Sequence, residues 1–190
     1  MKNIRELIGT EIIEEGNILK IRDVRIESDS IVLITEIVGK QEVKTYAFSE
    51  QSLRLFKNVH PDLIKIMKAA ITNSPYDFRI TAGARTAEEQ NALYQMGRTR
   101  KGAIVTRADG YINKSNHQIK SDGYGHAVDI FICGKYDENG NYIKFTSAEG
   151  YDNKKMKIVA DHIKSVAKNL GLHIEWGGDW KFYDSPHFQV

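Results

Sequence analysis

Hydrophobic and polar positions divide the chain into two parts with different periodicity. In the first 50 residues, short runs rich in Ile, Val and Thr are separated by polar breaks, which is typical of β-strands. This pattern predicts three strands, over 18–26, 31–38 and 42–48. From about residue 51 the apolar spacing becomes helical. We therefore expect a small β-rich accessory unit over 1–50 and a separate domain over 51–190.

Helices in the second part are predicted from apolar residues at intervals of three and four, together with end signals. They are expected to open at Pro61, at Thr86, and at Ser147 or Asp152. Proline is tolerated in a first turn, where its missing N–H leaves no bond unmade. Thr86 and Glu89 have the spacing of a capping box. The third helix is expected to end at Leu170, before a glycine suited to the C′ position.

Strands are predicted between and after these helices. They cover 77–81, 127–132, 172–176 and 187–190. Residues 98–114 are basic, contain glycine and have no periodicity. A segment of this length without regular structure is expected to be a functional loop around a site.

The stretch over 115–130 carries the most informative polar residues. Asp129 lies within an apolar run, and a buried carboxylate needs a partner or changes its protonation state. His117 and His187 each lie in a polar loop next to a predicted strand. Two imidazoles and one carboxylate are enough to hold a catalytic zinc ion and leave a position open for water. The spacing alone is only moderately specific for such a site.

The remaining four histidines have other interpretations. His60 is expected to cap a helix, His162 to lie beside a helix stripe, and His173 to be a surface or packing residue. His126 follows a glycine and could face the loop. Two further residues suit peptide hydrolysis: Asp184 as a proton acceptor, and an arginine in the turn before the second helix as a partner for an oxyanion.

Composition narrows the classes of partner. The chain has 190 residues and a net charge of +2 with a pI near 8.5, which is too mild to indicate nucleic acid and is compatible with an anionic polymer. Cys133 is the one cysteine, so no intramolecular disulfide is expected and this residue is interpreted as a small buried hydrophobe. Nothing in the sequence approaches a membrane span. The first residues lack the apolar core and cleavage site of a secretory signal.

Six segments carry a resemblance to a known family. They are 80–86, 89–94, 97–102, 115–117, 125–129, and 176–180 taken together with 184–188. In this order, over about residues 52–190, they resemble the L-alanyl-D-glutamate peptidases, which are phage endolysins and bacterial wall hydrolases of the zinc-dependent D-Ala-D-Ala carboxypeptidase superfamily. The resemblance implies a compact α+β fold, with helices packed on a small central antiparallel sheet.

The resemblance also implies site residues and a reaction. One zinc ion would be held by His117, Asp129 and His187. Asp184 would act as the general base and Arg85 would polarise the carbonyl group. The substrate groove would be lined by Ser115, Trp176 and Trp180. The reaction would be hydrolysis of the L-Ala–D-Glu bond in the peptidoglycan stem peptide.

The chain departs from the family pattern between the first two expected ligands. The family has a step of seven from histidine to aspartate, whereas here the step is twelve (129 − 117 = 12). A loop can absorb the five extra residues, within 118–123, at little entropic cost, so His117 is kept as the ligand. The insertion nevertheless leaves His126 open as a substitute.

Other functions stay open beside a phage endolysin. One is a D,D-carboxypeptidase or dipeptidase of the same superfamily. Another is a non-catalytic, metal-stabilised protein that binds the wall. The residues over 1–50 could be a plain accessory unit or a module for wall binding or virion docking. We expect a monomer that is made without a signal peptide, does not insert stably into the membrane and reaches the wall through a holin-type pore.

Overall fold

The computed structural model describes residues 11–14, 17–27, 30–40 and 45–190. The chain divides into two compact units, Met1–Lys44 and Thr45–Val190, and each is described here by itself. The division falls six residues before the boundary that the sequence pattern predicts. Among the described residues, no helix has both the length and the apolarity needed to cross a bilayer.

The smaller unit contains a three-stranded antiparallel sheet in the order β1-β2-β3. Its strands are β1 (Glu11–Glu14), β2 (Asn17–Glu27) and β3 (Ser30–Lys40). The strands predicted over 18–26 and 31–38 are confirmed as β2 and β3, whereas β1 was not predicted. Of the third predicted strand, residues 42–44 lie outside the described residues, and residues 45–48 form no strand.

Aromatic residues just after the boundary belong to the larger unit. The ring of Tyr46 stacks on that of Tyr136 at a centroid distance of 5.4 Å, and its hydroxyl accepts the Tyr136 main-chain N–H at 3.1 Å. Phe48 makes edge contacts with Phe56 and Phe78 of the core. These residues are apolar because they anchor the chain on the larger unit, which explains why the prediction of a strand there was wrong.

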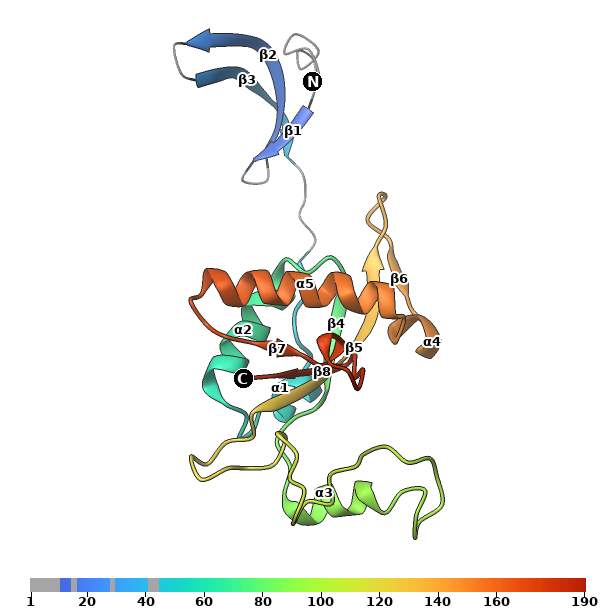
Figure 1. Ribbon diagram of the computed structural model, residues 1–190. Coiled ribbons are helices and arrows are strands. Elements are labelled where there is room, and N and C mark those ends of the chain that lie inside the picture. The colour runs from blue at the N-terminus through green and yellow to red at the C-terminus, as the bar shows by residue number, and fades with distance from the viewer. Residues whose placement is uncertain (1–10, 15–16, 28–29, 41–44) are drawn as a thin grey trace. The chain divides into compact units, whose positions relative to one another are not determined.

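One five-stranded antiparallel sheet organises the larger unit, with β5 in the middle (Figure 1). The order is β4-β5-β8-β7, and β6 pairs with the end of β5. The strands are β4 (Asp77–Ala82), β5 (Ala127–Tyr136), β6 (Tyr142–Lys144), β7 (Glu175–Trp176) and β8 (His187–Gln189). The predicted α+β class with a central antiparallel sheet is confirmed.

Five helices accompany this sheet. They are α1 (Glu50–Leu55), α2 (Pro61–Thr72), α3 (Ala87–Tyr94), α4 (Ser147–Gly150) and α5 (Asn153–Asn169). The capping box of Thr86 and Glu89 is present, and His60 is the N-cap of α2. The two alternative starts of the third predicted helix are both real, because α4 and α5 are separate helices. Asp152 caps α5 by accepting the Lys155 N–H.

The core lies between α2, α5 and one face of the sheet. Buried apolar side chains of both helices join Val128, Ile130 and Ile132 of β5 and Phe188 of β8 in one cluster. Side chains alternate along a strand, so Asp129 points to the opposite face. Figure 1 shows α5 at one end of the larger unit and α3 with its following loop at the other.

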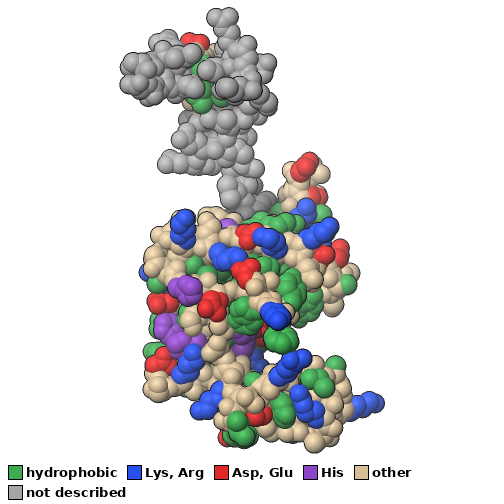
Figure 2. All heavy atoms as spheres, in the orientation of Figure 1, with side chains coloured by type: hydrophobic (Ala, Val, Ile, Leu, Met, Phe, Trp, Pro, Cys, Tyr) green, Lys and Arg blue, Asp and Glu red, His purple; other side chains and the backbone are tan. Residues whose placement is uncertain are grey.

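Basic and acidic side chains are mixed on the surface. On the face that Figure 2 shows, lysine and arginine side chains are spread over the larger unit among aspartate and glutamate. This arrangement fits the small net charge of the sequence. On this face it gives no continuous basic stripe of the kind that tracks a nucleic-acid backbone.

Candidate metal centre

Strand pairing positions two of the three expected ligands. In the antiparallel register of β5 and β8, Asp129 lies directly opposite His187. Both side chains therefore leave the sheet on the same face, away from the helical core. Gln189 follows two residues after His187 on β8 and so shares that face. This local geometry depends only on the hydrogen-bonded ladder between the two strands.

The third residue arrives from the loop before β5. The ring of His117 is 3% exposed, and its Nδ1–H donates to the carbonyl of Gly83 at 2.8 Å. The main-chain N–H of Arg85 donates to the carbonyl of His117 at 2.9 Å. The turn between β4 and α3 therefore holds both the backbone and the ring of His117, and Nε2 is directed at Asp129.

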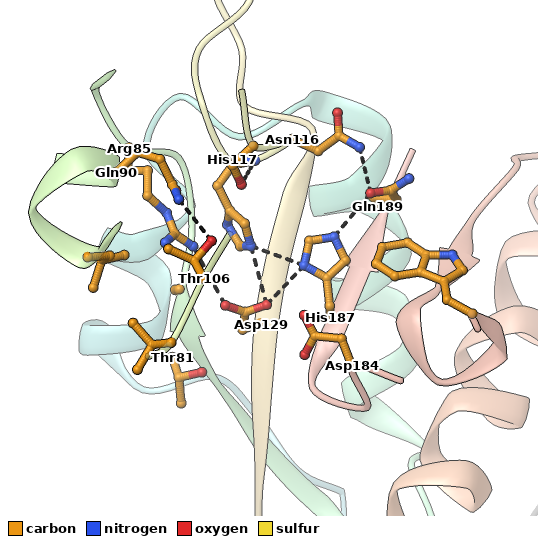
Figure 3. Close-up of a pocket in the computed structure, with 15 residues that line it drawn as sticks. Thr81, Arg85, Gln90, Thr106, Asn116, His117, Asp129, Asp184, His187 and Gln189 are labelled. Atoms are coloured by element: carbon orange, nitrogen blue, oxygen red, sulfur yellow. Dashed lines mark hydrogen bonds and ion pairs between the residues drawn. The ribbon is translucent and has the colours of Figure 1, made fainter. Parts of the chain in front are cut away.

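Three ligand atoms form an equilateral triangle (Figure 3). His117 Nε2, His187 Nδ1 and Asp129 Oδ1 lie 3.2 Å from one another. Tetrahedral ligands about 2.0–2.1 Å from a zinc ion are about 3.3 Å apart. The observed separations match that spacing closely, and all three residues line the cavity described below.

The second nitrogen of each ring is engaged elsewhere. The Nδ1–H of His117 donates to Gly83, and the Nε2–H of His187 donates to Gln189 Oε1 at 3.1 Å. Both remaining lone pairs then point towards the Asp129 carboxylate. Three acceptors that converge on one point repel each other unless a proton or a cation lies between them. This donor set, fixed by outer hydrogen bonds, is the usual arrangement at metal sites.

The pKa values of Asp129 and His187 are shifted in the directions expected if a proton can take the place of a cation between them. Burial raises the pKa of Asp129, but hydrogen bonds from His117 and His187 outweigh it, so the pKa lies below the ordinary value. Burial lowers the pKa of His187, but the bond to Asp129 outweighs it, so the pKa lies above 6.5. The carboxylate is therefore ionised at neutral pH, and a proton on His187 competes with a metal ion for the same nitrogen.

We predict a pH dependence of metal binding from the raised pKa of His187. Zinc must displace the proton that this ring holds, so apparent affinity falls by up to about tenfold per pH unit below that pKa. The decline should begin above pH 6.5, the ordinary value for histidine. Competition titrations with a chromophoric chelator at a series of pH values measure it. An affinity that stays constant down to pH 5.5 contradicts this prediction.

A second prediction concerns Gln189, which accepts the His187 Nε2–H. Gln189→Leu removes this acceptor and frees the ring to rotate, so zinc affinity should fall by about 10–100-fold. Gln189→Glu is the control, because it keeps an oxygen at the same distance. Equilibrium dialysis against buffered zinc measures both variants. Equal weakening in the two variants would point to a general packing defect instead.

A cavity of about 550 Å³ opens over the triangle. Arg85 contributes its guanidinium, whose Nη2 lies 3.7 Å from Asp129 Oδ2. Burial lowers the pKa of Arg85 and the neighbouring carboxylates offset part of this, yet an arginine stays charged at neutral pH. Of the other expected site residues, those that line the same cavity are Ser115, Trp180 and Asp184.

Asp184 is held at the rim of this cavity by the loop between β7 and β8. Its main-chain N–H donates to the Gly177 carbonyl at 3.0 Å, and its own carbonyl accepts the His187 N–H at 3.1 Å. A Cβ atom at Gly177 would lie 2.4 Å from the Asp184 carbonyl oxygen, so only glycine fits there. Burial, then repulsion by Asp129, raises the pKa of Asp184, which makes the carboxylate a better proton acceptor.

The placement of Trp176 in the groove is a correction. Trp176 is 3% exposed and belongs to the hydrophobic core. Its indole N–H donates to the Ser185 carbonyl at 2.7 Å. It therefore supports the loop that carries Asp184 from below, while Trp180 lines the cavity and packs against His187 at a ring distance of 5.0 Å.

The insertion loops out without displacing His117. The main-chain N–H of His126 donates to the Asn116 carbonyl at 2.7 Å, which closes the excursion at its base. Within it, the Lys120 N–H donates to the Tyr124 carbonyl at 2.9 Å. The structure thus brings His117 to Asp129 and His187, whereas His126 lies in a different group with His60 and Asp122.

Several residues of the site were missed by sequence reasoning. Gln189 supports His187, and Asn116 Nδ2 donates to Gln189 Oε1 at 2.6 Å. Gln90 is fully buried and lines the cavity, where its amide holds the following loop through the Ala108 carbonyl at 2.9 Å. Gln189 was detectable from its spacing of two from His187. The contacts of Asn116 and Gln90 depend on loop conformation and leave no such pattern.

Comparison with known proteins finds a family model and relatives that are described as L-alanyl-D-glutamate peptidases or endopeptidases. A family model described as phage L-alanyl-D-glutamate peptidase matches residues 44–189. The chain is 37% identical over 145 residues to the peptidoglycan L-alanyl-D-glutamate endopeptidase CwlK of Bacillus subtilis, covering 74% of this chain and 78% of that protein. It is 25% identical over 151 residues to the L-alanyl-D-glutamate peptidase of Escherichia phage T5, covering 77% and 90%.

A solved structure supports the fold. The crystal structure of the Serratia marcescens L-Ala D-Glu endopeptidase ChiX aligns with a TM-score of 0.51 at 23% identity. The alignment covers 78% of this chain and 92% of that one. The family match begins at residue 44, one residue before the larger unit begins.

Proposed function

The chain belongs to the phage L-alanyl-D-glutamate peptidase family, and from this premise we propose that it is a zinc peptidase that hydrolyses the L-Ala–D-Glu bond of peptidoglycan stem peptides. The observation that carries the proposal is the 3.2 Å triangle of His117, Asp129 and His187. Arg85 and Asp184 line the same cavity, so the groups needed for amide hydrolysis converge on one place.

Zinc suits this donor set. Two imidazole nitrogens and one carboxylate oxygen form a common catalytic zinc site with an open position, and hard cations such as calcium prefer oxygen ligands. When bound, the ion supplies Lewis-acid activation of water and of the scissile carbonyl. His117, Asp129 and His187 would hold it.

The other side chains of the cavity take the remaining roles. Asp184 accepts the proton of the attacking water and then delivers it to the departing amine of D-Glu. Its raised pKa favours the first of these transfers, the uptake of the proton from water. The Arg85 guanidinium stabilises the negative charge that develops on the carbonyl oxygen. Ser115 and Trp180 line the path of the stem peptide.

Digestion of purified peptidoglycan tests the reaction. The proposal predicts new N-termini of D-Glu, identified by labelling the amino groups and separating the hydrolysed products on a chiral column. Release of D-Ala from the stem would favour the D,D-carboxypeptidase alternative. Binding to the wall without new N-termini, in a protein loaded with zinc, would favour a non-catalytic wall-binding protein.

We further propose that the protein serves as a phage endolysin that needs another protein to reach the wall. The phage T5 relative supports this role. Expression in a susceptible bacterium should leave the cells intact until the membrane is permeabilised, after which turbidity should fall rapidly. Lysis at the same rate without permeabilisation contradicts the need for a separate pore.

The smaller unit is proposed to be accessory to catalysis, and the protein to act as a monomer. The family match begins at residue 44, the last residue of this unit, and so leaves out the rest of it. Every expected catalytic residue lies in the larger unit. Hydrolysis of a soluble stem peptide should therefore not depend on the smaller unit, whereas hydrolysis of intact walls will reveal any contribution to wall binding.

A further inference from the structure

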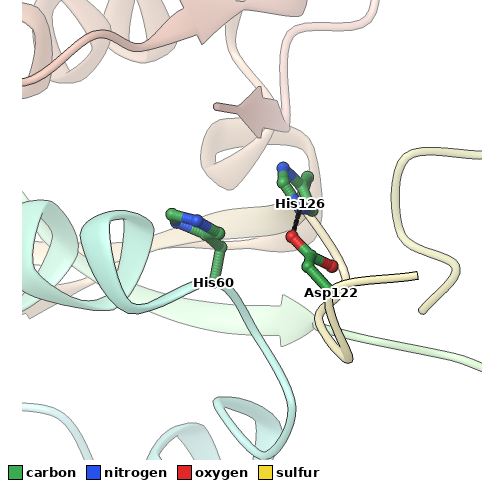
Figure 4. A group of neighbouring side chains, drawn as sticks. All are labelled: His60, Asp122 and His126. Atoms are coloured by element: carbon green, nitrogen blue, oxygen red, sulfur yellow. Dashed lines mark hydrogen bonds and ion pairs between the residues drawn. The ribbon is translucent and has the colours of Figure 1, made fainter. Parts of the chain in front are cut away.

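Figure 4 shows a second group of side chains that could hold a metal ion. His60, Asp122 and His126 each offer one ligand atom, and these atoms lie within 4.8 Å of one another. They come from three segments: the N-terminus of α2, the insertion, and the residue just before β5. In Figure 2, histidine side chains reach the surface at one edge of the larger unit beside acidic ones.

The contacts of His126 favour a cation at this place. Its Nδ1–H donates to the main-chain oxygen of Val190 at 3.2 Å, while its Nε2 lies 2.7 Å from Asp122 Oδ2. Both partners are oxygen acceptors, so the ring lies between two groups that favour a positive charge at this place. The side chain of His126 is 16% exposed, so this ligand is held in a largely buried position.

His60 completes the group from the other side. Its ring lies 4.7 Å from that of His126 between centroids. Its Nδ1 faces the Asp62 main-chain N–H at 3.3 Å and lies 4.0 Å from the Asp62 carboxylate. In the structure this nitrogen accepts the Asp62 N–H as the cap of α2. Metal binding through the other ring nitrogen requires a proton on Nδ1, which would then turn from the main-chain N–H to the Asp62 carboxylate. A carboxylate behind a metal-bound histidine is a common outer partner.

The backbone already holds these segments together. The His60 N–H donates to the Gly125 carbonyl at 2.9 Å, and the Gly125 N–H donates to the Asn58 carbonyl at 2.8 Å. Asp122 is fixed less firmly, by the Tyr124 N–H on its Oδ1 at 3.1 Å. Two ligands are thus pre-positioned, and the third lies on the insertion. All three ligand atoms already lie within 4.8 Å of one another.

We propose that His60, Asp122 and His126 form a second metal site, which binds a borderline divalent cation such as zinc and closes the insertion onto the N-terminus of α2. Two imidazoles and one carboxylate select such ions over calcium and magnesium. The ion joins segments 62 to 66 residues apart in the chain (122 − 60 = 62 and 126 − 60 = 66). Its role is structural, since it lies outside the catalytic cavity.

The site also affects the loop that carries a catalytic ligand. Asn116, which precedes His117, accepts the His126 N–H. A metal that immobilises His126 therefore also restrains the base of this loop. The inference goes beyond the proposed function and does not depend on it, because binding at this site can be measured without any substrate.

Counting bound zinc in the full-length protein tests the proposal. After metal removal, equilibrium dialysis against buffered zinc should load two equivalents on the unaltered chain. Asp122→Asn and His126→Gln should each load one. His173→Gln is the matched control, because His173 forms an exposed pair with Glu175 at 3.8 Å, and it should still load two. Asp129→Asn should lose the zinc ion of the His117 triangle and keep the ion held by His60, Asp122 and His126.

Tryptic cleavage at Lys120, an exposed residue of the insertion, gives a second readout. Free zinc at ten times its dissociation constant should slow cleavage by about tenfold if the loop must open first. In the Asp122→Asn variant, zinc should not slow tryptic cleavage at Lys120. One equivalent in both the unaltered chain and Asp122→Asn, with no protection of Lys120, overturns the proposal. Loss of peptidase activity with two equivalents still bound would count against the proposed function alone.

Discussion

Replacing His117, Asp129 or His187 by alanine is expected to remove the catalytic zinc and reduce stem-peptide hydrolysis by about 10³-fold or more, because Lewis-acid activation is worth several kcal/mol. Each residue supplies one corner of the 3.2 Å triangle. Two remaining ligands would hold the ion weakly and in the wrong geometry. Elemental analysis of dialysed protein and a peptide-cleavage assay measure the two effects together.

His162→Ala is a suitable control for these variants. His162 is half-buried and contacts the Ala70 carbonyl at 2.9 Å, so its loss tests whether removing any histidine contact reduces activity. It should lower stability without changing the amount of bound zinc. A His187→Ala protein that folds, keeps its full zinc content and cleaves at the unaltered rate would show that the triangle is not the catalytic centre.

Asp184→Asn is expected to keep the zinc and reduce kcat by about 10²–10⁴-fold, the usual contribution of a general base. The amide preserves the shape of the side chain and its place in the loop, but it cannot accept a proton. Zinc content should be unchanged because Asp184 is not part of the triangle. Single-turnover rates and elemental analysis separate the chemical effect from a loss of metal.

The matched control for this change is Asp179→Asn. Asp179 lies in the same loop, where its carboxylate forms an exposed ion pair with Lys164 at 2.8 Å. Exposed pairs contribute little to stability, so this variant should cleave at the unaltered rate. If Asp184→Asn retained more than half of the unaltered kcat, another group would have to accept the proton.

The helices and central strands were predictable because their apolar spacing is long and regular. The stripe of α2 and the alternation in β5 each bury one face in a single core. By contrast, β6 was missed because all three of its residues are exposed, so its sequence shows no alternation. It forms because β5 extends past the core and offers a free edge.

The site was only partly predictable from residue patterns. Asp129 and His187 lie 58 residues apart (187 − 129 = 58), and only the ladder of β5 and β8 makes them neighbours. Their grouping with His117 was only moderately specific from residue types and loop positions, and the family resemblance implied the same three ligands. The error over Trp176 was avoidable, because Ile174 and Trp176 are buried two residues apart, as expected for the core face of a strand.

The insertion shows where such a resemblance ends. The five added residues lengthen the step between His117 and Asp129 beyond the family spacing. That they form a loop closed at its base is shown only by the main-chain hydrogen bond from His126 to Asn116. The same residues supply Asp122 to the second group. A departure from the family pattern was therefore the best sequence signal for a feature particular to this chain.

Anomalous diffraction from crystals of the zinc-loaded protein tests the central claim most directly. The account predicts a zinc peak about 2.0–2.1 Å from His117 Nε2, Asp129 Oδ1 and His187 Nδ1, facing the cavity that Arg85 and Asp184 line. A well-occupied zinc peak elsewhere, with these three side chains bound to no ion, would contradict it.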